Sequence, residues 1–114
     1  MHYVIEPMGK PRMTQRDKWG EREAVQRYWA FKEECQVKGV QVPEQGADIT
    51  FIMPMPKSWS NKKKEKMNGI QHQQKPDIDN LLKALLDAVY KDDSKVWDIK
   101  ARKIWGFKGA INIC

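Results

Sequence analysis

The chain has 114 residues, a length that fits one domain with a modest core. Hydrophobic residues make up 40% of it, which excludes an intrinsically disordered chain. No apolar run approaches the roughly 18 residues that span a bilayer, and the first residues lack the apolar core of a signal peptide. We therefore expect a cytoplasmic protein without a membrane partner.

The formal net charge of +6 indicates an anionic partner, although charge alone leaves DNA, RNA, a membrane surface and simple solubility open. Two cysteines, Cys35 and Cys114, belong to no CxxC pair and to no Cys/His cluster with zinc spacing. We expect two idle thiols rather than a disulfide or a zinc site.

The first half of the chain alternates short strands with one helix. Tyr3 and Ile5 share a face of an expected strand over residues 2–6. Apolar side chains recur at three- and four-residue spacings between residues 21 and 38, which predicts a helix. Residues 47–53 alternate apolar and polar side chains, which predicts a second strand with one buried face.

Two polar segments carry much of the positive charge. Residues 9–20 form a loop by their Gly and Pro content, and residues 57–75 form either a short exposed helix or a mobile loop. Their cations predict phosphate contacts, which give affinity without reading sequence, although a solvated loop explains the lysine run equally well. The predicted DNA contacts are Lys10, Arg12, Arg16, Lys18, Lys62, Lys63, Lys64 and Lys75.

The chain contains five tryptophans, for which we expect different environments. Trp19 and Trp59 lie in the polar segments, where each either stacks on unpaired bases or covers the edge of the core, and we favour the core. Trp29, Trp97 and Trp105 are expected in the core or in a dimer interface.

The second half contains the clearest helix, over residues 77–90, whose leucine-rich stripe faces the core. Asp79 or Asn80 is its expected N-cap. Strands are expected over residues 96–105 and 107–113.

No internal repeat and no linker divides the chain. The sequence therefore predicts a single domain over residues 1–114. Its class is α/β (α+β), with a mixed or antiparallel sheet of about four strands and two main helices.

Six aspartates stand within 22 residues of this otherwise basic chain. On an extended segment Asp77 and Asp79 point to the same side, so both carboxylates face one point. Lys83 follows Asp79 by one helical turn, and a chain that turns back after the helix would place a third carboxylate beside the pair. The six are Asp77, Asp79, Asp87, Asp92, Asp93 and Asp98.

Clustered carboxylates resist ionising together unless a cation neutralises them. Mg²⁺ prefers oxygen ligands, polarises a phosphoryl oxygen and lowers the pKa of an attacking water, so the cluster predicts phosphodiester chemistry. Lys83 would stabilise the charge of the transition state. The pattern alone leaves a structural interpretation open, in which the acids stabilise a helix dipole and a turn. His72 is near the acids in sequence, and we expect it to be an exposed loop residue, with a catalytic role as the less favoured alternative.

Residues 75–96 read KPDIDNLLKALLDAVYKDDSKV. This segment resembles the signature of the RusA family of Holliday junction resolvases, a helix of pattern D-[LI]-D-N-L-x-K-x-x-x-D-x-[LV] followed by an acidic pair. A weaker similarity runs through the loop at residues 9–12. The resemblance implies a homodimeric, Mg²⁺-dependent endodeoxyribonuclease for four-way junctions, with Mn²⁺ as a substitute and no other cofactor.

The resemblance also implies roles for single residues. Asp77, Asp79 and Asp93 match the metal-binding carboxylates, and Lys83 matches a catalytic lysine. Asp92 belongs to the metal-binding set as well, and the resemblance leaves open whether Asp92 or Asp93 is the closer ligand. The supporting positions are Asn80, which braces the site or caps the helix, and Asp87, a recurrent acid.

Membership would place the protein in DNA recombination and repair, and its small size favours a phage or prophage role. The dense basic run at residues 57–66 departs from the pattern, so no sequence preference at the cut is carried over. A catalytically inactive junction-binding protein is the alternative, although binding alone gains nothing from carboxylates that face phosphates. A small RNA-binding or membrane-surface protein would leave the aspartates unexplained.

Overall fold

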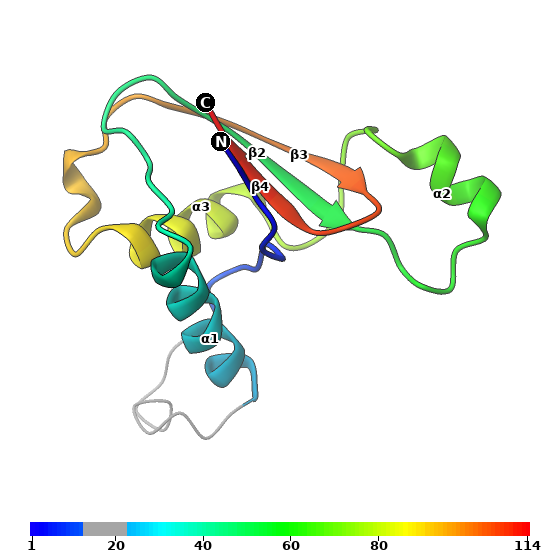
Figure 1. The fold of residues 1–114 in the computed structure, drawn as a ribbon, viewed down its shortest axis with the longest axis horizontal. Helices are drawn as coiled ribbons and strands as arrows, with labels where there is room; N and C mark the ends of the chain where they lie inside the picture. The colour runs from blue at the N-terminus through cyan, green and yellow to red at the C-terminus, as the bar shows by residue number, and fades with distance from the viewer. Residues whose placement is uncertain (13–22) are drawn as a thin grey trace.

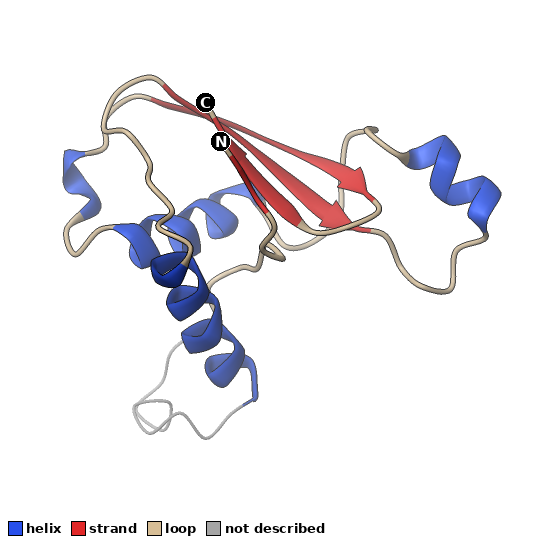
Figure 2. Cartoon of the chain, viewed as in Figure 1, coloured by secondary structure: helices blue, strands red, loops and turns tan. Residues whose placement is uncertain are grey.

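The computed structural model describes residues 1–12 and 23–114, and they form one α+β unit. A four-stranded mixed sheet lies against two long helices, and a short third helix stands apart at one end (Figures 1 and 2). The elements in chain order are β1 (His2–Tyr3), α1 (Glu23–Val37), β2 (Ala47–Pro54), α2 (Asn61–Met67), α3 (Ile78–Val89), the 3₁₀ turn η2 (Asp93–Lys95), β3 (Ile99–Gly106) and β4 (Ala110–Ile113).

The strand order in the sheet is β1-β4-β2-β3. β2 pairs in parallel with β3 along its whole length, from Ala47 opposite Ile99 to Pro54 opposite Gly106. On its other side β2 pairs antiparallel with β4, which in turn pairs antiparallel with β1. A parallel pair needs a crossover connection, and α2 and α3 supply it here. The mixed form of the expected four-stranded sheet is therefore confirmed.

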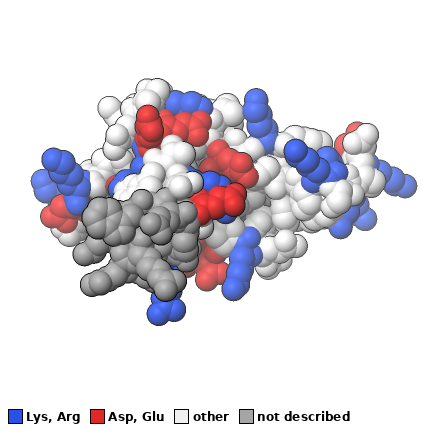
Figure 3. All heavy atoms as spheres, turned by 90° about the horizontal axis from the view of Figure 1, so that it is seen from below, with Lys and Arg blue, Asp and Glu red and all other residues white. Residues whose placement is uncertain are grey.

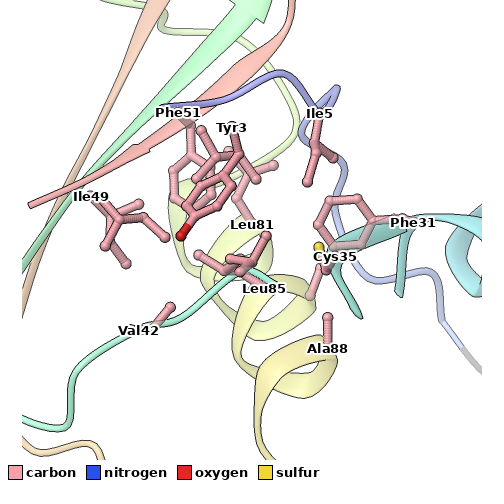
Figure 4. Close-up of a cluster of buried hydrophobic side chains, with 14 of the residues drawn as sticks. Tyr3, Ile5, Phe31, Cys35, Val42, Ile49, Phe51, Leu81, Leu85 and Ala88 are labelled. Atoms are coloured by element: carbon pink, nitrogen blue, oxygen red, sulfur yellow. The ribbon is translucent and has the colours of Figure 1, made fainter. Parts of the chain in front are cut away.

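The core lies between the sheet and the two long helices (Figure 4). Ile49 and Phe51 point inward from β2, as the alternation of residues 47–53 predicts. They meet Leu81 and Leu85 from α3, with Phe31 and Cys35 from α1 nearby. Truncating a leucine at such a site to alanine costs about 2–5 kcal/mol of folding free energy.

The predicted first and last residues of the strands differ from those in the structure. β1 covers only His2–Tyr3, and β3 begins at Ile99 because its pairing with β2 starts there, opposite Ala47. Trp97 consequently lies outside the strand and is 70% exposed. β4 begins at Ala110, because the turn from β3 ends at Gly109, where a Cβ would lie 2.9 Å from the Cα of Glu6.

Both long helices are confirmed, with changes in detail. Tyr28 of α1 is buried as expected, but Trp29 is 46% exposed, whereas Trp105 lies in the core. The segment between β2 and α3 contains a helix, α2, so the helical alternative for it is correct. Trp59 is partly buried against Trp105 and covers the edge of the core, while Trp19 lies outside the described residues.

Both cysteines are free thiols, as expected. Burial raises the pKa of the Cys35 thiol to about 11, the neighbouring Glu34 carboxylate adds to the rise, and the thiol stays protonated at neutral pH. Among the described residues, no helix is long and apolar enough to cross a membrane.

Candidate metal and DNA site at the start of α3

Two aspartates of the predicted site, Asp77 and Asp79, lie at the start of α3. The backbone N–H groups of Asn80 and Leu81 both donate to the Asp77 carbonyl oxygen at 3.1 Å, so the helix begins directly after Asp77. Asp77 is the N-cap and Asp79 lies in the first turn, and both are exposed. The expected extended segment and the expected N-cap at Asp79 or Asn80 are therefore wrong. The helix begins earlier because the Asp77 backbone accepts its first hydrogen bonds.

The exposed carboxylates remain neighbours in this arrangement. Asp77 directly precedes the helix and Asp79 belongs to its first turn, where the helix dipole favours negative charge. The dipole also supports the structural interpretation of these acids. The exposure of both side chains leaves their oxygens available to a hydrated cation.

Lys83 follows Asp79 by four residues and is exposed as well. Residues four apart lie one above the other on the same helix face. This face is opposite to that of Leu81 and Leu85, which are fully buried. Asp79 and Lys83 therefore present a carboxylate and an ammonium group side by side to solvent.

Two contacts hold the loop that leads into α3. The Lys103 ammonium group on β3 donates to the carbonyl oxygens of Gln74 at 2.7 Å and Pro76 at 2.9 Å. Gly9 packs so closely on Asn80 that a Cβ there would lie 2.5 Å from the Asn80 side-chain nitrogen. Asn80 thus contacts the N-terminal loop, in keeping with its predicted bracing role. No sequence signal pointed to Lys103, since a lysine on a strand is usually only solvated.

Asp87 lies two turns further along α3 and joins three parts of the chain. Its carboxylate accepts a hydrogen bond from the Tyr28 hydroxyl and forms ion pairs with Lys32 at 3.3 Å and Lys10 at 3.8 Å. Burial raises the pKa of Asp87, but the Tyr28 hydrogen bond and the two ammonium groups outweigh it and hold the pKa below its usual value. Burial and the Asp87 carboxylate raise the pKa of Tyr28, so its hydroxyl stays a donor. The geometry agrees with a supporting role for Asp87.

Asp92 and Asp93 lie beyond the opposite end of α3. The helix has 12 residues, which corresponds to about 18 Å between its ends. The chain does not turn back far enough to bring a third carboxylate to Asp77 and Asp79. In the described part of the chain, no group of three or more His, Cys, Asp or Glu side chains is close enough to hold a metal ion.

The two acids of this pair differ in their surroundings. The Asp92 carboxylate accepts a hydrogen bond of 3.1 Å from the Ser94 backbone N–H and caps η2. Hydrogen bonds from Ser94 lower the pKa of Asp92. Asp93 is exposed, and among the described residues its carboxylate makes no such hydrogen bond, so its oxygens are less constrained than those of Asp92.

The predicted DNA contacts are spread over three places. Lys10 and Arg12 lie in the N-terminal loop, and Lys75 is exposed just before α3. Lys62, Lys63 and Lys64 lie on α2, which projects from the sheet and shows its basic side chains at the right of Figure 3. The Lys63 ammonium group sits 4.2 Å from the centre of the Trp59 ring. Arg16 and Lys18 lie outside the described residues.

A cavity of about 770 Å³ opens beside the start of α3. Its lining includes Lys75, Pro76 and Asn80 at the candidate site, and His72 and Trp105 at the sheet. The expectation that His72 is exposed is wrong: it is 6% exposed, because its ring packs on Trp105 with 4.2 Å between the ring centres. Sequence spacing gave no sign of this cavity, since its walls come from five separate segments.

The donor set at the start of α3 fits a magnesium ion. Mg²⁺ keeps several waters and is often held by only one or two protein carboxylates in phosphoryl-transfer sites. Asp77 and Asp79 offer such a pair, with the Lys83 ammonium group beside it. The structure thus brings together three of the four predicted catalytic residues and leaves Asp93 apart.

Two comparisons with known proteins bear on this site, and no solved structure matches the chain. The chain is 38% identical over 74 residues to the uncharacterised protein YqaN of Bacillus subtilis (strain 168), a match that covers 58% of this chain. The chain spans about half of that relative, 52% of its length. The family model for endodeoxyribonuclease RusA matches residues 5–114, which is nearly the whole sequence. The chain therefore belongs to the RusA endodeoxyribonuclease family.

Proposed function

We propose that the protein is a structure-selective, Mg²⁺-dependent endodeoxyribonuclease that cuts four-way DNA junctions. The observation that carries this proposal is the exposed group of Asp77, Asp79 and Lys83 at the start of α3. It stands in a chain of net charge +6 that belongs to a nuclease family. From membership of this family and from this group of residues we infer that the site cleaves branched DNA.

Asp77 and Asp79 would hold the metal ion through their carboxylate oxygens. A bound Mg²⁺ supplies Lewis acidity towards a phosphoryl oxygen and lowers the pKa of an attacking water. Lys83 donates to a non-bridging oxygen of the phosphate that is cut and stabilises the extra negative charge of the transition state. Asn80 fixes the N-terminal loop against the helix that carries these groups.

The basic residues outside the catalytic group position the DNA. Lys75 lies two residues before Asp77, and Lys10 adjoins Gly9, which packs on Asn80, so both are proposed to contact the phosphates that flank the cut. The lysines of α2 reach a second stretch of backbone, because α2 projects away from the sheet. Such contacts add affinity without reading sequence.

The active form is proposed to be a homodimer. A four-way junction has two-fold symmetry, and paired cuts need two sites, which one chain does not provide. Trp97 and Trp29 support an interface, since both are large apolar side chains that are exposed in the single chain. The dimer would act on recombining DNA in the cytoplasm.

The test is a gel assay on a synthetic four-way junction and on a linear duplex of the same sequence. Paired nicks at symmetric positions of the junction alone, present with Mg²⁺ or Mn²⁺ and abolished by EDTA, are expected. Tight junction binding without cleavage in either metal would show instead a catalytically inactive junction-binding protein. Equal cleavage of the duplex would remove the structure selectivity.

A further inference from the structure

We infer that the cavity beside α3 receives one nucleobase of the bound DNA, next to the phosphate that is cut, and that His72 contacts this base. The inference rests on the proposed nuclease function and adds a base-binding site to it.

The inner wall of the cavity is apolar and partly aromatic. Phe31, Met53 and Trp105 line it, and each of them is almost fully buried. Trp59 and His72 already pack on Trp105, so these side chains present apolar edges to the cavity, and a nucleobase would be held there by apolar contact. A volume of about 770 Å³ is in the range of nucleotide-sized ligand pockets and is too small for a duplex.

The cavity is lined by charged groups of both signs, with three cations against two carboxylates. Lys10, Arg27 and Lys75 line it, together with the two carboxylates of Glu6 and Glu34. Arg27 and Lys75 are exposed, so these two cations are placed for phosphates outside the cavity while the base points inward, whereas the partly exposed Lys10 also pairs with Asp87 at 3.8 Å. An apolar interior behind cations fits a nucleotide unit of a DNA strand.

The position of the cavity indicates which nucleotide of the bound strand would enter it. Pro76 directly precedes Asp77, Asn80 directly follows Asp79, and both residues line the cavity. A phosphate bound at Asp77 and Asp79 therefore has its neighbouring nucleotide at the mouth. At a branch point a base loses a stacking neighbour, which lowers the cost of its insertion into a protein pocket.

His72 is the polar group of the inner wall. It is 6% exposed, and its Nδ1 has no hydrogen-bond partner among the described residues. Burial lowers its pKa, and the nearby Lys103 ammonium group lowers it further, so the ring is neutral at pH 7. Binding pockets commonly combine apolar walls with few polar groups, and a neutral imidazole offers one donor and one acceptor nitrogen to the edge of a base.

The experiment combines a filled cavity with missing bases. Ala30 lines the cavity from an exposed position of α1, so Ala30→Phe fills the space without disturbing the core. Gln36→Phe is the matched control, because Gln36 is exposed on the same helix and does not line the cavity. Junctions with a single abasic residue at each position around the cut are titrated by fluorescence anisotropy, with Ca²⁺ in place of Mg²⁺.

At one position within about two nucleotides of the cut, loss of the base should weaken binding by wild type and by Gln36→Phe about 10-fold. Ala30→Phe should bind the intact junction about 10-fold more weakly and should be indifferent to the abasic residue at that position. No sensitive position in wild type, or a sensitive position that persists in Ala30→Phe, would overturn the inference. Failure of wild type to cut or bind the intact junction would instead overturn the proposed function.

A second variant tests the contact of His72. His72→Phe keeps an aromatic ring on Trp105 but removes both ring nitrogens. We expect junction binding by His72→Phe still to weaken when the base at that position is missing. Its affinities for junctions that carry each of the four bases at that position should lie within about two-fold of one another. A base preference equal to that of wild type would show that His72 does not contact the base.

Discussion

The ammonium group of Lys103 donates a hydrogen bond of 2.9 Å to the carbonyl oxygen of Pro76, so that β3 holds the residue directly before Asp77. A second bond, to the Gln74 carbonyl oxygen, fixes the same loop. The sheet and α3 are thus connected at the point where the proposed metal site begins. The position of Asp77 depends on a residue that would not itself touch metal or DNA.

Lys103→Met should therefore impair the site without removing any catalytic group. The loss of two hydrogen bonds from a charged donor should lower the free energy of unfolding by about 1–3 kcal/mol, and displacement of Asp77 should slow junction cleavage about 10-fold. The Mg²⁺ concentration for half-maximal rate should rise as well, which a purely structural defect would not cause. Lys103→Arg should restore much of the rate, and Lys100→Met, on the same strand, should behave as wild type.

The Asp87 network predicts a pH-dependent contribution to stability. The folded-state pKa of Asp87 lies below the ordinary value of 3.8, so its stabilising effect is fully present above that value and is lost as pH falls through the folded pKa. Asp87→Asn should be less stable than wild type by about 1 kcal/mol at pH 7, a modest figure because the carboxylate is partly exposed. The difference should shrink below pH 3.8. Urea unfolding at pH 7 and pH 3 measures it, and a difference that is equal at both pH values would contradict the assignment.

The lysines of α2 predict the salt dependence of binding. Each phosphate contact contributes about 0.9 to the slope of log affinity against log salt concentration. Replacing Lys62 and Lys64 with glutamine should make this slope shallower by about two, for a junction and for a duplex alike. Replacing Lys38 and Lys100, which lie on other elements, should leave it unchanged. An unaltered slope in the α2 variant would show that α2 does not contact the backbone.

The distance between Asp93 and Asp79 predicts where Asp93 acts. Within one chain the length of α3 separates them, so we expect Asp93 to join the site of the partner subunit in the proposed dimer. Asp79→Asn and Asp93→Asn should each be inactive alone. In an equal mixture, mixed dimers would contain one intact site, and single-strand nicks should appear at about a quarter of the wild-type rate.

An inactive mixture would contradict this arrangement, since two variants that damage sites within their own chains cannot complement each other. Full activity of Asp93→Asn alone would show that the metal is held without Asp93. Size-exclusion chromatography of the mixture confirms that dimers have exchanged. Each result leaves the roles of Asp77 and Asp79 open to separate test.

The fold followed closely from the spacing of apolar side chains. The alternation in residues 47–53 and the stripe on α3 are local signals, and the structure buries Ile49, Phe51, Leu81 and Leu85 as these signals require. Strand ends were harder to predict. Trp97 has strand propensity, yet it lies outside β3, because its backbone N–H donates to the Glu44 carbonyl oxygen in the loop before β2 and the paired register begins only at Ala47 and Ile99.

The site was predictable only where its residues are close in sequence. Asp77, Asp79 and Lys83 lie within seven positions, so helical geometry alone brings them together. Lys103, His72 and Gly9 reach the same region through sheet order and loop packing, which spacing does not encode. The predicted return of Asp93 to the start of α3 fails for the same reason, since the direction of the chain after a helix is set by tertiary contacts.

The measurement that tests the central claim most directly is the rate of junction cleavage by Asp79→Asn, with Asp98→Asn as the matched control. Asp98 is also an exposed aspartate, but it lies beyond η2 and outside the proposed site. We predict that Asp79→Asn cuts at least about 100-fold more slowly in Mg²⁺ while its junction affinity stays within a few-fold of wild type, and that Asp98→Asn cuts normally. Cleavage by Asp79→Asn at the wild-type rate would contradict a metal-dependent active site at the start of α3.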